Sequence, residues 1–187
     1  MNQSRIYLDE CAQKAKAAFS FLKNTTIEER ATFMHAVADR IASLGEELIA
    51  IAHRETALPF ARLVGEKART VGQWRLYADA LRSGVYTEAR IDLANAEKNK
   101  SDIRKYSIGI GPVLVFGASN FPFAFSTAGG DTASAIAAGC PVIVKGNQGH
   151  VETSTIMAEV IAAVVDDFGW TSGVFTHIIG NKVEDSE

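Results

Sequence analysis

The sequence predicts an α/β fold, in which N-terminal helices precede a partial Rossmann-like βαβαβ parallel sheet. Through residues 1–84, apolar side chains recur every three or four positions, as they do in amphipathic helices. Within residues 108–187, short continuous apolar runs alternate with helical patterns, which is typical of parallel strands joined by crossover helices. Residues 85–107 between them are polar and predict a linker or a loose hairpin. We therefore expect a helical segment, a connection and the first half of a doubly wound domain.

Several helices are predicted in residues 1–84. Thr26 and Glu29 have the spacing of a capping box, so we expect one helix to begin there and to end near Gly45. Gly84 is expected to end the last helix, because glycine readily adopts the left-handed conformation that follows a helix C-terminus. We expect these helices to cover the sheet rather than to bind a ligand. The residues whose spacing predicts their buried faces are Leu8, Cys11, Ala15, Ala18 and Leu22; Phe33, Val37, Ile41 and Leu44; Leu48, Ile51 and Ala52; and Val64, Ala68, Val71, Arg75, Ala78 and Leu81.

Three strands and two helices are predicted in residues 108–187. Residues 113–116 form a continuous apolar run, as expected of a parallel strand that is covered on both faces. Pro122 suits the first position of a helix over residues 123–138. Gly129 and Gly130 within it each cost about 1 kcal/mol relative to alanine, which implies close approach of the backbone to the sheet or to a cofactor. The remaining elements are expected at residues 141–145 (strand), 151–168 (helix) and 173–179 (strand).

Composition and charge exclude several classes of partner. The chain of 187 residues is 22% charged and 47% hydrophobic, which are ordinary values for a globular protein in water. A formal net charge of −3 gives no electrostatic reason to expect nucleic acid or an anionic membrane surface. The first residues lack the apolar core of a secretory signal, and no apolar run approaches the roughly 20 residues of a membrane span. We therefore expect a cytoplasmic protein, and no metal site is predicted from its scattered histidines, His35, His53, His150 and His177.

The turn VFGASNFP, the helix AGGDTASAIAAG and the strand that ends at Lys145 resemble the aldehyde dehydrogenase superfamily. The branch that they resemble most is that of the NADP-preferring fatty aldehyde and 2,5-dioxopentanoate (α-ketoglutarate semialdehyde) dehydrogenases. The resemblance extends to the helical segment from Thr26 to Gly84, in which ETALPFARLVGEKARTVGQWRLYADALRSG stands where the family carries a Glu-Thr-Gly-x-Pro helix region. It implies that residues 108–187 are the first half of a nucleotide-binding domain.

The same resemblance implies an oxidoreductase that uses NADP to oxidise an aldehyde to a carboxylic acid, with NAD as the alternative cofactor and a homo-oligomer as the assembly. Family enzymes continue through a catalytic domain with a nucleophilic cysteine and a base glutamate, whereas this sequence ends in the polar stretch NKVEDSE. We therefore expect a truncated, N-terminal part that has no turnover alone and does not stay a simple monomer. The alternative is a non-catalytic nucleotide-binding or subunit-interaction protein derived from the same fold.

Asn120 lies in the turn between the first predicted strand and the helix that follows it. Oxidation of an aldehyde through a thioester passes through a tetrahedral oxyanion, which a side-chain amide held at such a turn can stabilise. The resemblance assigns this role to Asn120. From the residues alone an alternative stands, that Asn120 caps the helix that follows Phe121 and Pro122.

Lys145 and Gln148 are the predicted cofactor contacts. Lys145 ends the second strand, and the carboxyl ends of parallel strands form the ligand crevice of doubly wound sheets. The resemblance implies that Lys145 contacts the adenosine ribose, and that Gln148 replaces a glutamate that commonly binds both ribose hydroxyls. A carboxylate would repel a 2′-phosphate whereas a neutral amide can donate to it, so this pair favours NADP. The resemblance also places along the cofactor cleft Phe116, Gly117, Ser119 and Asn120. Without the resemblance, the alternatives are that Lys145 is exposed to solvent and that Phe116 belongs to the core.

Cys11 and Cys140 lie far apart without a CxxC spacing, as a reducing compartment permits. Cys140 stands between Gly139 and Pro141, where a helix is expected to end and a buried strand to begin. A reactive thiolate needs an exposed, electropositive setting. We therefore interpret Cys140 as a small core residue and not as a catalytic thiol.

Overall fold

The computed structural model describes residues 5–180. The helical segment consists of α1 (Arg5–Leu22), α2 (Ile27–Ser43), α3 (Glu46–Thr56) and α4 (Phe60–Ser83), followed by the short turn η1 (Val85–Thr87). An arm is formed by β1 (Arg90–Asp92) and β2 (Ile103–Lys105). The α/β part contains β3 (Val113–Phe116), α5 (Gly130–Ala137), β4 (Val142–Lys145), η2 (Gln148–His150), α6 (Val151–Asp167), η3 (Ser172–Val174) and β5 (Phe175–Ile178). The predicted fold class, helices followed by a partial parallel sheet, is therefore confirmed.

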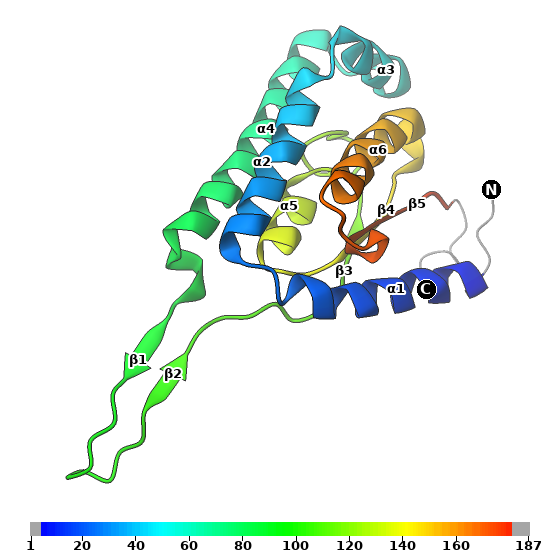
Figure 1. Cartoon of the computed structure of the whole chain (residues 1–187). Helices are drawn as coiled ribbons and strands as arrows, with labels where there is room; N and C mark the ends of the chain where they lie inside the picture. The colour runs from blue at the N-terminus through cyan, green and yellow to red at the C-terminus, as the bar shows by residue number, and fades with distance from the viewer. Residues whose placement is uncertain (1–4, 181–187) are drawn as a thin grey trace.

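The sheet is parallel, with the strand order β3-β4-β5, so β3 and β5 are its edges. Val115, Val144 and His177 are register partners and share one face of the sheet. On this face lie α5 and α6, with α2, α3 and α4 outside them, while α1 crosses the opposite face below β4 and β5 (Figure 1). Because each strand starts at the same end, the carboxyl ends of all three strands meet at one edge.

Local sequence signals set most of the helix boundaries. The predicted capping box is present, since the Thr26 hydroxyl accepts from the Glu29 N–H and the Glu29 carboxylate accepts from the Thr26 N–H. Gly84 ends α4 in the left-handed conformation, with φ of 70°. Ala57, which stands where the related motif has glycine, ends α3 with φ of 56°, an uncommon conformation for a residue with a Cβ.

The buried face of α4 differs from the predicted one in its first half. Val64 is 52% exposed, and Ala68 and Arg75 are also exposed. The helix instead buries Glu66 and Trp74, together with Leu63, Thr70, Val71, Ala78 and Leu81. The prediction failed because it assumed that a carboxylate faces water, whereas Glu66 has polar partners in the interior.

The helix predicted for residues 123–138 begins only at Gly130. Residues 122–129 form a series of turns, with Gly129 in the extended N-cap position of α5. A Cβ at Gly129 would lie 2.5 Å from the carbonyl oxygen of Ala124. The close approach predicted for these glycines is therefore found at Gly129, toward the turn, whereas a Cβ at Gly130 would make only ordinary contacts.

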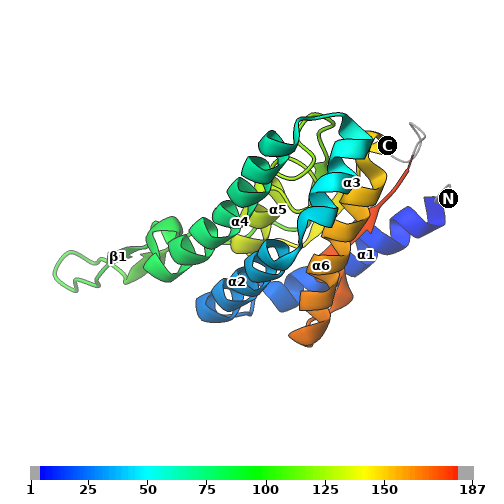
Figure 2. The same cartoon turned by 90° about the horizontal axis from the view of Figure 1, so that it is seen from above.

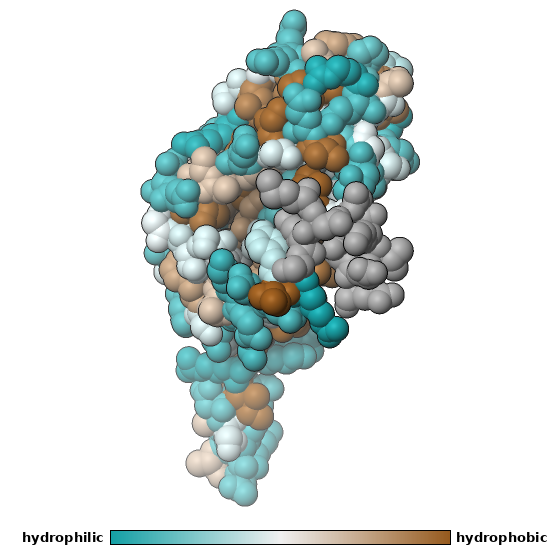
Figure 3. Space-filling view, turned by 90° about the vertical axis from the view of Figure 1, so that its right-hand side faces the viewer, coloured by the Kyte–Doolittle hydropathy of each residue, from teal (hydrophilic) through white to brown (hydrophobic). Residues whose placement is uncertain are grey.

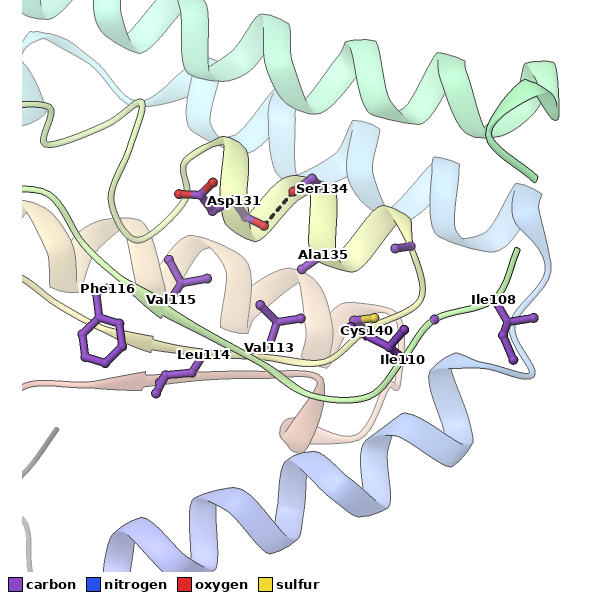
Figure 4. Close-up of a pocket in the computed structure, with 12 residues that line it drawn as sticks. Ile108, Ile110, Val113, Leu114, Val115, Phe116, Asp131, Ser134, Ala135 and Cys140 are labelled. Carbon is purple, nitrogen blue, oxygen red and sulfur yellow. Dashed lines mark hydrogen bonds between the residues drawn. The ribbon is translucent and has the colours of Figure 1, made fainter. Parts of the chain in front are cut away.

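The strand β3 is covered on one face only, contrary to the prediction. Val115 is buried under α5, but Leu114 is 52% exposed and Phe116 is 54% exposed on the opposite face. Figure 4 shows the side chains of Val113 and Val115 on the α5 side of the strand and those of Leu114 and Phe116 on the other side. The reason is that α1 packs against β4 and β5 and does not extend over β3.

The polar stretch between α4 and β3 contains an antiparallel hairpin that projects from the body (Figures 1 and 2). Arg90 pairs with Lys105, and an isolated bridge joins Asn95 to Lys100 nearer the tip. Figure 3 shows hydrophobic residues among the mostly polar ones on this projection. Its exposed apolar side chains are Ile91, Leu93, Ile103 and Tyr106. The division of the chain into domains at residues 84 and 107 stays a prediction.

Arg30 is buried, with 7% exposure, where α1, α2 and the base of the arm meet. One guanidinium nitrogen donates to the Thr25 carbonyl oxygen at 3.0 Å, and the other donates to the Tyr86 hydroxyl at 3.1 Å. The charge is thus satisfied by oxygen acceptors within the fold. None of the helices within residues 5–180 is long and apolar enough to cross a membrane.

Candidate functional site

The carboxyl ends of β3 and β4 bring most of the predicted cofactor residues together. Phe116 and Lys145 are register partners, so their side chains lie next to each other on the same face of the sheet. Phe116 is 54% exposed, which corrects the alternative that it belongs to the core. Lys145 is half-buried, and its side chain makes no hydrogen bond or ion pair within residues 5–180. A flat apolar ring beside an unpaired ammonium group suits a ligand that combines a ring with hydroxyl or phosphate oxygens.

The loops that follow the two strands are joined by hydrogen bonds. The Gly117 N–H donates to the Lys145 carbonyl at 3.0 Å, and the Asn147 side-chain amide donates to the Gly117 carbonyl at 2.9 Å. The His150 ring contacts the Ala118 carbonyl at 2.8 Å through Nε2. The loop with Gly117 and Ser119 therefore lies beside η2, at the sheet edge where Lys145 ends. Sequence reasoning missed the roles of Asn147 and His150, because each contacts the backbone of a loop about 30 residues away.

Gln148 reaches the same edge but has an intramolecular partner. Its side-chain amide donates to the Gly180 carbonyl at 2.7 Å, just after β5. An amide group has two N–H donors, so one remains for a ligand.

Asn120 lies elsewhere, at the side of the turn that faces α4. Its backbone carbonyl accepts a hydrogen bond of 2.6 Å from the Arg62 guanidinium. No hydrogen bond joins Asn120 to Lys145 or Gln148. The residue is exposed, and its side-chain amide makes no hydrogen bond within residues 5–180. The capping alternative is wrong, because the following helix starts ten positions later with Gly129 as its N-cap. The Asn120 amide is thus available as a donor to a reacting group.

Side chains of α4 form hydrogen bonds to the backbone of the turn that carries Asn120. One Glu66 carboxylate oxygen, Oε1, accepts from the N–H groups of Phe123 and Ala124 at 2.8 and 3.0 Å. Further along, the Trp74 indole donates to the Ala128 carbonyl at 2.8 Å. Neither contact could be predicted from the sequence, since both residues occupy ordinary helix positions and their partners are more than 50 residues away.

The N-terminus of α6, which could attract a ligand phosphate, is already occupied. The Glu55 carboxylate accepts from the N–H groups of Glu152 and Thr153 at 2.7 and 2.9 Å and from the Thr153 hydroxyl at 2.7 Å. This contact explains why a glutamate at position 55 matters to the fold, since it joins α3 to α6 and complements the helix dipole.

A buried chain of side chains supports the loop after β4. The Thr127 and Ser154 hydroxyls lie 2.5 Å apart, and Ser154 Oγ lies 2.8 Å from His177 Nε2. A Cβ at Gly146 would lie 2.7 Å from both Ser154 Oγ and His177 Nε2, so only glycine fits between them. Burial lowers the pKa of His177 from 6.5 to about 4, because the protonated ring loses its hydration.

This pKa predicts a pH dependence of stability. Between pH 6.5 and 4 the unfolded chain binds a proton at His177 that the folded chain excludes, so the free energy of unfolding falls as the pH falls. The full loss is up to about 3 kcal/mol. We expect His177→Gln to reduce this decline, which urea unfolding at pH 7, 5.5 and 4.5 would measure. Parallel curves for both proteins would contradict the assignment.

A groove of about 580 Å³ runs along the free edge of β3 (Figure 4). It is lined mainly by apolar side chains, among them Ile108, Ile110, Leu114, Phe116 and Ala135. Cys140 borders it but is only 3% exposed, and Cys11 is buried as well. Both cysteines therefore have core positions, as predicted for Cys140. Within the described part of the chain no group of histidine, cysteine, aspartate and glutamate residues could hold a metal ion.

The comparison with known families agrees with this arrangement. The model of the aldehyde dehydrogenase family matches residues 2–186. The chain belongs to the aldehyde dehydrogenase family. It is 48% identical to α-ketoglutaric semialdehyde dehydrogenase 2 of Azospirillum brasilense over 92% of this chain and 34% of the relative. It is also 48% identical to α-ketoglutaric semialdehyde dehydrogenase of Acinetobacter baylyi, over 96% of this chain and 35% of the relative. The chain thus spans about a third of the length of these curated relatives.

Solved structures share the fold. One of them is the NADP-dependent glyceraldehyde-3-phosphate dehydrogenase of Bacillus halodurans in complex with NADP. It matches with a TM-score of 0.81 at 24% identity, and the match covers 96% of this chain and 37% of that enzyme's chain. An NAD-dependent benzaldehyde dehydrogenase of Corynebacterium glutamicum has a TM-score of 0.78 at 21% identity, with 96% and 37% covered. At these identities the two structures support the fold alone.

Proposed function

We propose that this chain supplies the adenosine-binding edge and the oxyanion donor of an NADP-dependent aldehyde dehydrogenase that oxidises an aldehyde to a carboxylic acid. The observation that carries the proposal is the half-buried, unpaired Lys145 beside the exposed Phe116 at the carboxyl edge of the sheet. Such an edge is where doubly wound folds bind their ligands. The similarity to α-ketoglutaric semialdehyde dehydrogenases makes an oxo-acid aldehyde the substrate class to test first.

The residues of the edge fit an adenosine 2′-phosphate. Lys145 offers a cation without a partner among residues 5–180, and Gln148 offers a neutral amide that has a second N–H besides the one donated to Gly180. Gly117 accepts from the Asn147 amide at the same edge, and the Ser119 side chain lies beside Gly149. NADP, when bound, would accept the hydride of the aldehyde. Lys145 and Gln148 would hold its phosphorylated ribose, while Asn120 would donate to the oxyanion of the tetrahedral intermediate.

The proposal can be tested with this chain joined to the part of the Acinetobacter baylyi relative that it does not match. We expect NADPH formation from oxo-acid aldehydes with the joined enzyme and none with the chain alone, because Cys11 and Cys140 are buried. If the joined enzyme folds and binds NADP but oxidises no aldehyde, the proposal fails, and a non-catalytic nucleotide-binding protein becomes the better description. Two buried, unpaired cysteines agree with the proposed cytoplasmic location.

Gln148→Glu is expected to shift the cofactor preference of the joined enzyme from NADP toward NAD by about tenfold. A carboxylate a few ångströms from the 2′-phosphate adds a repulsion of about 1–3 kcal/mol, which NAD does not experience. The measurement is the ratio of kcat/KM for the two cofactors. Gln148→Ala is the matched control, because it removes the bond to Gly180 without adding charge. An equal shift in both variants would contradict the electrostatic explanation.

We also propose that the chain self-associates through the free edge of β3. Val113 and Gly117 donate their N–H groups toward β4, so those of the alternate residues Leu114 and Phe116 face outward without a partner strand. The exposed side chains of these two residues add apolar surface beside the groove. A two-fold axis at Val115 would pair Leu114 of one copy with Phe116 of the other in an antiparallel ladder.

Leu114→Lys is expected to convert the dimer into a monomer at micromolar concentration, because a charge on an edge strand opposes pairing. Light scattering over a range of concentrations measures the change in mass. Leu76→Lys is the matched control, since Leu76 is 59% exposed on α4, away from this edge. Leu114 is a better probe than Val115, whose side chain is buried under α5. A wild-type chain that stays monomeric would refute the proposed association.

A further inference from the structure

The turn that presents Asn120 is held by side chains from one face of α4. Arg62, Glu66 and Trp74 are four and eight residues apart along the helix, a spacing that places them on one side. Each forms a hydrogen bond to the backbone of residues 120–128. The backbone of the turn is thus fixed by helix side chains as well as by its own short-range bonds.

Glu66 is the central contact. Its side chain is buried, with 6% exposure of the residue, and Oε1 accepts from two successive backbone N–H groups, those of Phe123 and Ala124. Hydrogen bonds to an ionised acceptor are about twice as strong as neutral ones, and they gain further strength away from water. The other oxygen, Oε2, is buried without a partner. The two bonds at Oε1 therefore have to offset the cost of removing this carboxylate from water.

The segment on the other side of Asn120 is restrained too. Arg62 donates to the Asn120 carbonyl, and its guanidinium carbon lies 4.8 Å from the centre of the Phe121 ring. Pro122 has its φ angle fixed by its own ring. Between the Asn120 carbonyl and the Phe123 N–H, little rotational freedom is left. The backbone on both sides of the Asn120 side chain is therefore restrained by groups on α4.

We propose that Glu66 is a positioning residue for Asn120, holding the turn so that the Asn120 amide is aimed at the reacting oxygen before substrate arrives. The inference rests on the proposed role of Asn120 as oxyanion donor. An oxyanion donor needs this support, because electrostatic stabilisation depends on a dipole that does not have to reorient during the reaction.

The first test uses the chain alone and does not depend on any activity. In Glu66→Ala, hydrogen exchange at the Phe123 and Ala124 amides is expected to accelerate at least tenfold beyond the change in global stability, and the Asn120 side-chain amide signals should broaden or split. Glu66→Gln, which keeps an acceptor oxygen, should largely restore both. Trp74→Phe is the matched control, because it weakens the far end of the same loop without touching these amides. Unchanged local exchange in Glu66→Ala would overturn the inference.

The second test is a double-mutant cycle in the joined enzyme. Glu66→Ala is expected to lower kcat by about tenfold or more with little change in KM for NADP, and to cause no further loss when Asn120 is already alanine. Additive losses, or a loss equal to that of Trp74→Phe, would show a merely structural role. If Asn120→Ala itself retains full kcat, the proposed function of Asn120 fails and the inference with it. If Asn120→Ala is impaired but Glu66→Ala is not, only the positioning inference fails.

Discussion

Asn120→Ala is expected to lower kcat of the joined enzyme by about 10²- to 10³-fold, which is the usual effect of losing one oxyanion donor. The loss should fall on kcat and kcat/KM together, because the amide contacts the oxyanion of the intermediate and not the cofactor. The structure supports this expectation, because the Asn120 amide is exposed and has no hydrogen-bond partner within residues 5–180, on a turn whose backbone is bound by Arg62 and Glu66.

Steady-state and single-turnover measurements with the same aldehyde distinguish the chemical step from product release. Asn120→Asp provides the control, since it keeps the shape of the side chain while replacing the N–H donor by a negative charge. We expect it to be at least as impaired as the alanine variant. A loss of only a few fold in either variant would mean that Asn120 does not stabilise the oxyanion.

Trp74→Ala is expected to reduce the free energy of unfolding of the chain by about 3–5 kcal/mol, a large part of the 5–15 kcal/mol typical of a domain. Trp74 has no exposed surface and is the largest fully buried side chain of the described residues. Its removal opens a cavity between α4 and the turn, and leaves the Ala128 carbonyl without its donor. Both effects act where α4 packs against the end of this loop that is farther from Asn120.

Chemical denaturation gives the size of this effect. Trp74→Phe should cost less, about 1–3 kcal/mol, because it keeps most of the apolar volume and loses chiefly the indole hydrogen bond. Leu76→Ala, at a position of the same helix that is 59% exposed, should change stability by no more than about 0.5 kcal/mol. Equal costs at Trp74 and Leu76 would contradict the packing described here.

Much of the fold follows from signals between near neighbours. Thr26 and Glu29 form the predicted capping box, and Gly84 ends α4 as expected, because the atoms that decide these features are within a few residues of one another. The β3 and β4 strands also lie where apolar runs predicted them. The family followed from motifs that are contiguous in the sequence, and the comparison with known families confirms it.

The errors have one physical cause. Local patterns predict that residues 123–129 are part of a helix, but the Phe123 and Ala124 N–H groups donate to Glu66, and the Ala128 carbonyl accepts from Trp74. Each of these partners lies on α4, more than 50 positions away. Similarly, the exposure of Phe116 depends on where α1 ends its coverage of the sheet. The helix propensity of one segment cannot predict hydrogen-bond donors and acceptors that a distant segment supplies in the folded chain.

Patterns along the chain predict the order of helices and strands, the parallel sheet, the family and the candidate site residues, because periodicity, caps and motifs are local properties. How those residues are presented depends on tertiary contacts. The tertiary structure joined Lys145 to Phe116 by strand register, bound Gln148 to Gly180 and placed the turn of Asn120 on the buried carboxylate of Glu66. These contacts join segments far apart in sequence, and the buried carboxylate of Glu66 needs its N–H partners because burying an unpaired polar group is costly.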